Sequence, residues 1–360
     1  MRILPQKFSS ELRRREDKRA LKALICTLIF VFCVRKKSRN AHRSRNLVSR
    51  RLEAAWCEPI VLHVEYGLNN RLRSYASVAA FARRSNCSFF VIWPIDNSCK
   101  ATFTELFRRP AMVSAIYDTK EEFMREWSSE QHWKSYDYTQ TPQIRSRLLI
   151  RRPNAPYSGI YVRSSEVVHF QNFQITSSNL GTELAALEPV DSVTSRIATF
   201  KQRYNLQDSI GLHIRMNYNF RTDIPGISVD LLQRLALTNL AEERRRCHYS
   251  SFVKVIKNWP HYTKGGLVVV ASDSSSALIE LRKAFSESTV VSVDEYLSNA
   301  CNAGNHVRED ICLRYCFLEQ KVLAETRHFF YSTSSSLSEN ILYLRSNLTR
   351  TDQERSSGCE

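Results

Sequence analysis

An arginine and a histidine stand two residues apart in the apolar run IGLHIR at 210–215. If this run is a strand, its two-residue alternation places His213 and Arg215 on one face. A guanidinium binds a diphosphate through paired hydrogen bonds and offsets the charge that grows on a leaving nucleoside diphosphate. The pair therefore predicts a diphosphate grip at Arg215, although a surface strand with two polar residues has the same pattern.

Other polar residues follow apolar runs in the same half of the chain. Asp273 comes after LVVVA at 267–271, where a carboxylate accepts from a ribose hydroxyl, holds Arg215 in place, or simply caps a helix. Ser334 and Ser335, in STSSS at 332–336, offer hydroxyls and N–H groups at a helix start, which favours phosphate. Because ligands bind beyond the carboxyl ends of strands in an open α/β sheet, we expect one shared site.

A further candidate place lies near the start, in GLNNRLR at 67–73 after the β-rich run IVLHVE. The glycine at 67 is expected to let the chain turn with a positive φ, and the amides of Asn69 and Asn70 can bond a close ligand. An ordinary helix start has the same residues. The sequence identifies no general base, and Glu65, at the end of the run, is left as an open candidate.

The sequence has no D-x-D motif and no His, Cys and Asp cluster with zinc spacing. Transferases that hold a divalent ion on the diphosphate use paired carboxylates for it. The sequence therefore predicts a site without a metal, in which side chains and helix ends supply the positive charge.

Alternating strand and helix patterns surround these residues in both halves and predict a doubly wound α/β fold. Apolar residues at helical spacing follow the first run, and residues 110–200 are expected to complete its domain. We expect an N-terminal domain at 55–203, a nucleotide-binding domain at 204–346 and a tail at 347–360. The expected strands are 60–65, 89–93, 210–215, 267–271, 289–293 and 329–332, with helices at 275–285, 307–326 and from 335 onward.

Most of the net charge of +16 lies in a basic N-terminal tail at 1–54. A specific nucleic-acid partner is not predicted, because such a tail is more often solvated or next to a membrane. The apolar residues 23–34 span about 18 Å as a helix, short of the roughly 30 Å of a bilayer core. A short signal anchor is favoured, with the rest of the chain lumenal; a cleaved signal peptide and a soluble protein are the alternatives.

Eight of the ten cysteines lie outside the apolar segment. An even number suits an oxidising lumen, and free buried thiols are the alternative. Two sequons, at Asn86 and Asn347, permit N-glycosylation. These features favour a glycoprotein of the secretory pathway.

In their order, these segments resemble the fucosyltransferase superfamily of α-1,6-fucosyltransferases, nodulation fucosyltransferases and protein O-fucosyltransferases. GLNNRL at 67–72 resembles the Gly-x-Gly-Asn-Arg-Leu start of that group. The segment from Trp93 to Phe107 is similar to its Trp-x-x-Asp-x-x-Cys stretch, and LEP at 187–189 to its approach to the second domain. The His-x-Arg pair, the Ala-Ser-Asp at 271–273 and the serine run follow, over residues 58–345.

The resemblance implies a GT-B fold of two Rossmann-like domains, GDP-fucose as donor, no separate cofactor, and inverting transfer without a metal to a glycan or protein hydroxyl. Carried over by position, Asn70 would face the donor or acceptor, His213 would approach the nucleotide, and Arg215 would hold the β-phosphate. Ser335 would contact the diphosphate, and Glu319 stands where many relatives carry an aspartate that pairs with guanine.

Two departures from the family pattern keep other functions open. Met216 follows Arg215 where relatives often carry a second arginine, and Asn69 replaces the second glycine of the opening motif. The alternatives are a transferase for another GDP-sugar and a catalytically silent glycan-binding relative. For the enzyme, the expected location is the Golgi or another secretory-pathway membrane.

Overall fold

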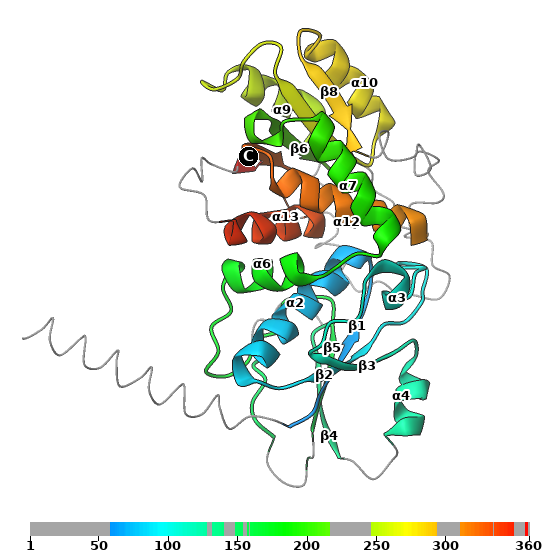
Figure 1. The fold of residues 1–360 in the computed structure, drawn as a ribbon. Coiled ribbons are helices and arrows are strands. Elements are labelled where there is room, and N and C mark those ends of the chain that lie inside the picture. Colours follow the sequence, from blue (N-terminus) through cyan, green and yellow to red (C-terminus); the bar gives the residue numbers. More distant parts are fainter. Residues whose placement is uncertain are drawn as a thin grey trace, which may run out of the picture. The chain divides into compact units, whose positions relative to one another are not determined.

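Two parallel five-stranded sheets, each flanked by helices, form the framework of the chain (Figure 1). The computed structural model describes residues 58–127, 132–139, 148–153, 157, 159–216, 246–293, 310–333, 335–348 and 357–358. Both sheets belong to one compact unit, Cys57–Glu360. The predicted α/β class with two parallel sheets is confirmed, and the domain boundary near 203 stays a prediction.

The first sheet has the strand order β3-β2-β1-β5-β4. The two expected strands, β1 (Ile60–Val64) and β2 (Phe89–Ile92), are present and almost entirely buried. Sequence patterns did not predict the other three, which are β3 (Val113–Tyr117), β4 (Trp133–Asp137) and β5 (Gly159–Ser164). Because β1 lies between β2 and β5, the chain changes direction across the sheet at the carboxyl ends of β1 and β5.

The second sheet has the order β10-β9-β6-β7-β8, with β6 at its centre. Its strands are β6 (Ile210–Ile214), β7 (Leu267–Ser272), β8 (Thr289–Ser292), β9 (His328–Tyr331) and β10 (Ser357–Gly358). The first four agree with the sequence. Two residues of the expected tail at 347–360 form β10, which pairs in parallel with β9.

Helices connect the strands and carry the apolar faces that cover them. In the first half these are α2 (Leu68–Ser85), α3 (Phe103–Leu106), α4 (Lys120–Glu126), α6 (Ser177–Ala186) and α7 (Asp191–Arg203). In the second half they are α9 (Tyr249–Lys257), α10 (Ser275–Ala284), α12 (Asp310–Ala324) and α13 (Ser336–Asn347). The residues expected at helical spacing in α2, from Leu72 to Ala82, are buried as predicted.

A close helix crossing joins α6 to α13, which follows the second sheet (Figure 1). A Cβ on Gly181 of α6 would lie 2.0 Å from the carbonyl oxygen of Tyr343 in α13. Only glycine lets the two backbones approach so closely. The Gly181 contact therefore fixes where α13 crosses α6.

Some sequence predictions fall outside the described residues. They include the apolar segment 23–34, the basic tail and Ser334. No helix within the described ranges is long and apolar enough to cross a membrane.

Candidate functional site

Arg215 follows β6 directly, at the carboxyl edge of the second sheet. Its Nε lies 3.2 Å from Oδ2 of Asp273, which follows the neighbouring β7. Oδ1 of the same carboxylate accepts a hydrogen bond of 2.8 Å from the backbone N–H of Met216. Asp273 therefore fixes both the guanidinium and the chain that carries it, one of the roles expected from the sequence. The Arg215 side chain remains 39% exposed.

Ser332, which follows β9, and Ser338 of α13 are both hydrogen-bonded to the end of β6. The N–H of Arg215 donates to Oγ of Ser332 at 2.9 Å, and the buried His213 shares a hydrogen bond of 2.6 Å between its Nδ1 and Oγ of Ser338. Ser338 in turn donates to the Ser332 carbonyl at 2.8 Å. In this structure, His213 thus anchors α13 beside Arg215. Sequence reasoning missed Ser338, which lies 125 residues from its partner.

Ser335 is the N-cap residue of α13 and is largely buried, yet its side chain makes no capping hydrogen bond. Its hydroxyl is bonded to none of the described residues. A helix N-terminus carries unpaired N–H groups and a partial positive charge, which bind anions. The start of α13 and the Arg215 guanidinium thus place positive potential at one edge of the sheet.

The loop before α2 differs from the expected glycine turn. Gly67 has an extended backbone with φ −65°, whereas Tyr66 adopts the left-handed conformation with φ 63°. Gly67 is the N-cap of α2, which has neither a side-chain cap nor an acidic residue in its first turn. Asn70, in that turn, is partly buried, and its side chain makes no hydrogen bond with a described residue.

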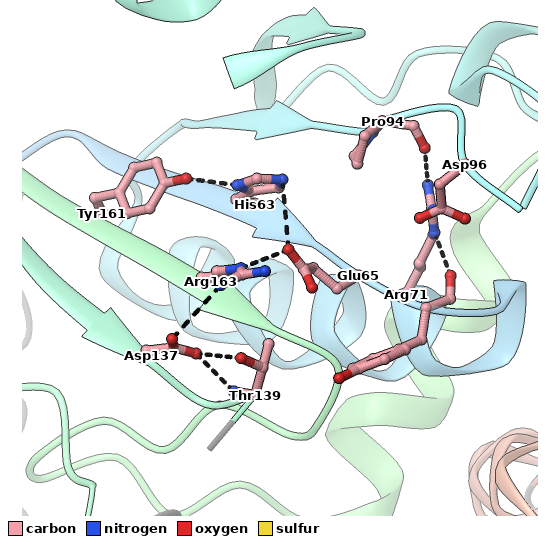
Figure 2. A network of polar contacts seen from close by, with 10 residues as sticks. His63, Glu65, Arg71, Pro94, Asp96, Asp137, Thr139, Tyr161 and Arg163 are labelled. Atoms are coloured by element: carbon pink, nitrogen blue, oxygen red, sulfur yellow. Dashed lines mark hydrogen bonds and ion pairs between the residues drawn. The ribbon is translucent and has the colours of Figure 1, made fainter. Parts of the chain in front are cut away.

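Arg71 holds this loop together from inside (Figure 2). Its buried guanidinium donates to the carbonyls of Tyr66 at 2.6 Å and Pro94 at 2.5 Å, and to Oδ2 of Asp96 at 2.7 Å. These partners follow β1 and β2. The arginine of the opening motif thus has a structural role, joining the ends of two neighbouring strands.

The pKa of the Cys316 thiol, on α12, is influenced by the charges of Glu319 and Arg215. Burial, and to a smaller degree the negative charge of Glu319, raises the pKa of the Cys316 thiol to about 12, whereas the positive charge of Arg215 acts to lower it. Both charged groups therefore lie close enough to the thiol to act on it. The structure thus joins Arg215 to Asp273, and His213 to α13, at the carboxyl edge of the second sheet, whereas Glu319 lies on α12.

A separate polar cluster lies at the carboxyl ends of β1, β5 and β4 (Figure 2). His63 Nδ1 lies 2.5 Å from the Tyr161 hydroxyl, and Glu65 accepts from Nε of Arg163 at 2.5 Å. Asp137 lies 3.8 Å from the same guanidinium. Burial lowers the pKa of His63 to about 4, so the imidazole is neutral at pH 7. Of this cluster, only Glu65 stood out in the sequence, and it is already engaged in an ion pair.

Within the described ranges, no group of three or more His, Cys, Asp or Glu side chains could hold a metal ion. Arg215 and the start of α13 both lie at the carboxyl edge of the second sheet and carry positive potential. The nearest carboxylate, Asp273, is engaged with Arg215 and the N–H of Met216.

No protein-family model and no curated protein matches the chain. Among solved structures, it is similar to fucosyltransferase NodZ from Bradyrhizobium, at 14% identity and a TM-score of 0.46, over 81% of this chain and 93% of that one. It is also similar to NodZ α-1,6-fucosyltransferase soaked with GDP-fucose, at 14% identity and a TM-score of 0.47, over 81% and 92%. The similarity to POFUT1 in complex with GDP-fucose has 12% identity and a TM-score of 0.49, over 84% and 98%.

Proposed function

We propose that the chain is a glycosyltransferase that takes a sugar from a nucleoside diphosphate donor without a metal ion. One observation carries the proposal: Asp273 fixes the half-exposed guanidinium of Arg215 at the carboxyl end of β6, and the backbone N–H of Arg215 is bonded to Ser332, which precedes the uncapped start of α13. A diphosphate needs donors of this kind, arranged before it binds.

In the proposed reaction, this site stabilises the leaving group. When the bond between the sugar carbon and the diphosphate oxygen breaks, the electron pair and the negative charge pass to the nucleoside diphosphate. Arg215 and the α13 N–H groups would offset that charge, and the Ser335 hydroxyl would donate to a phosphate oxygen. The acceptor hydroxyl would attack the opposite face of the sugar carbon, which inverts its configuration, and its proton would pass to the departing diphosphate or to water.

The sequence motifs support GDP-fucose as the donor. The opening motif, the Trp-x-x-Asp-x-x-Cys segment, the His-x-Arg pair and the serine run occur in the order of the fucosyltransferase superfamily. Glu319 would accept from the guanine N1–H and amino group. A longer carboxylate than the aspartate of many relatives keeps another GDP-sugar as the second candidate.

Cysteine chemistry supports a compartment of the secretory pathway. Cys247 and Cys312 each take part in a disulfide bond, and disulfides persist in oxidising compartments. The proposed anchor is the apolar segment 23–34, and the proposed acceptor is a glycan or a protein hydroxyl.

The test is a binding and turnover panel on the full chain. Isothermal titration with GDP, UDP, GDP-fucose, GDP-mannose and UDP-glucose, together with donor hydrolysis, should single out GDP and GDP-fucose. Binding of UDP-sugars instead of GDP-fucose would overturn the donor assignment. Binding of GDP-fucose without hydrolysis or transfer would favour the silent glycan-binding relative.

Arg215 is tested in the same panel. Arg215→Ala should weaken GDP binding and lower kcat/KM by about 10² or more, since it removes a charged donor from the diphosphate. Arg215→Lys should recover part of the binding but little of the turnover, because lysine lacks the planar fork. Arg327→Ala is the matched control, an arginine of similar exposure beside β9, 4.0 Å from Asp208. It should leave both quantities unchanged.

A further inference from the structure

Asn69 makes contacts that the glycine of the family motif could not make. It lies in the first turn of α2, and its side chain reaches α12. Its Oδ1 accepts from Nε2 of Gln320 at 2.7 Å, and its Nδ2 donates to Sγ of Cys316 at 3.5 Å. Its backbone carbonyl accepts from Nδ2 of Asn340 in α13 at 3.1 Å. Asn69, near the start of α2, thus contacts both α12 and α13.

The partners of Asn69 stand next to residues of the candidate donor site. Gln320 directly follows Glu319 on α12. Asn340 lies two residues after Ser338, which is bonded to His213. A shift of either helix would therefore move Glu319 relative to the phosphate-binding edge, or move the start of α13.

Both amide partners are fully buried, so these contacts are costly to lose. Gln320 and Asn340 are each 0% exposed, and Oε1 of the first and Oδ1 of the second have no hydrogen-bond partner among the described residues. Removing the Asn69 side chain would take away the one partner that the Gln320 amide has outside its own helix among the described residues. A buried amide left in this way rearranges or shifts its helix.

Arg73 provides a comparison on the same face of α2, one turn further on. It pairs with Glu339 of α13 at 2.5 Å and with Glu166 at 2.7 Å. It thus ties α2 to α13 as Asn69 does, but no contact with α12 is found among the described residues. Both side chains bond α13, at Asn340 and Glu339 respectively, and only that of Asn69 also bonds α12 among the described residues.

We infer that Asn69 is a positioning residue for the donor site: its amide sets the register of α12 against α2, and so sets the position of Glu319, which precedes Gln320 on α12. The inference rests on the proposed function. It also explains why asparagine stands where the family motif has glycine, since only a side chain at position 69 can bond Gln320 and Cys316.

The test compares Asn69→Ala and Asn69→Gly with Arg73→Ala. Both Asn69 variants should raise the donor KM and the Kd for GDP about tenfold, the effect of one lost net hydrogen bond, while kcat changes less than threefold. Arg73→Ala should lower the midpoint of thermal unfolding and leave the Kd for GDP within about twofold. Each variant is first checked for a cooperative thermal transition.

Comparing two nucleobases distinguishes a misplaced Glu319 from a general loosening of the fold. The Asn69 variants should lose most of the preference for GDP over inosine diphosphate, which lacks the amino group that a carboxylate accepts from. If wild-type protein binds GDP and the Asn69 variants bind it equally well, the inference is wrong and the proposed function stands. An equal loss in Arg73→Ala would show a merely structural role and overturn it as well. If wild-type protein binds no GDP, the proposed function fails, and the inference fails with it.

Discussion

At the scale of single residues, the ion pair of Arg215 and Asp273 is the centre of the proposed diphosphate site. Asp273 divides its two oxygens between the guanidinium and the N–H of Met216, so one carboxylate orients both. An arginine held in this way loses little freedom when a diphosphate arrives, which favours binding.

Asp273→Asn tests this orientation. The amide keeps an acceptor for the Met216 N–H but loses the ion pair with Arg215, so donor kcat/KM should fall about tenfold. Unfolding in urea should change little, because Arg215 is half exposed. Asp191→Asn, which removes an exposed partner of Arg108, is the control and should retain full activity. Wild-type kinetics in Asp273→Asn would contradict the positioning role.

A substitution at Gly67 distinguishes an effect on folding from an effect on ligand binding. Its backbone is extended, and a Cβ there would meet no atom closer than 3.8 Å, from Ser98. Gly67→Ala should therefore change the free energy of unfolding by only about 1 kcal/mol, the modest cost of alanine at an N-cap. GDP binding should weaken if the donor lies against this turn. Titration calorimetry and urea unfolding of the same variant measure the two effects.

The lowered pKa of His63 predicts that stability depends on pH. The pKa of His63 is lowered by burial from 6.5 to about 4, so the unfolded chain binds a proton more readily than the folded chain between these values. Stability from this group is therefore complete above pH 6.5 and is lost as the pH falls toward 4, by up to about 3 kcal/mol. Urea midpoints of the wild type and of His63→Leu between pH 4 and 8 should show the difference. Parallel profiles would contradict a buried neutral imidazole.

At the scale of elements, the crossing of α6 and α13 carries the clearest stability prediction. Gly181→Ala would force a Cβ to within 2.0 Å of the Tyr343 carbonyl, so the two helices must separate. The free energy of unfolding should fall by about 3 kcal/mol, as for overpacked cores. Gly67→Ala is the matched control in the same urea titration. An equal, small effect of both substitutions would show that α6 and α13 are free to adjust.

Elements with long apolar runs could be predicted from the sequence, and mixed ones could not. β1, β2, β6 and β7 are buried on both faces and read as continuous hydrophobic stretches. β4 is an edge strand, WKSYD, none of whose residues is fully buried, so it has no such run. The two residues of β10 are too few to show any period.

The same reasoning found the charged half of the candidate site but not its supports. Arg215 and Asp273 end their strands, which made them visible in the sequence. Ser338 and Gln320 are ordinary polar residues on helices, and their partners lie 125 and 251 residues away. Contacts of such range depend on how the sheets and helices assemble, which no local pattern encodes.

At the scale of the whole molecule, the two sheets belong to one compact unit that does not include residues 1–56. The basic charge is concentrated in that excluded segment, so folding and donor binding should not depend on it. The proposed anchor, residues 23–34, lies in that segment.

Deleting residues 1–54 tests this independence. The shortened chain should unfold cooperatively and bind GDP with the affinity of the full chain, while association with membranes in cell fractions should be lost. Circular dichroism, titration calorimetry and fractionation measure these three properties. A shortened chain that is folded but no longer binds GDP would contradict the assignment of the donor site to the second sheet.

The most direct test of the whole account is a crystal structure of the chain with GDP. The account predicts that the diphosphate lies within hydrogen-bond distance of the Arg215 guanidinium and the first N–H groups of α13, with Glu319 against the base. Diphosphate bound elsewhere, with Arg215 still paired only to Asp273, would contradict it.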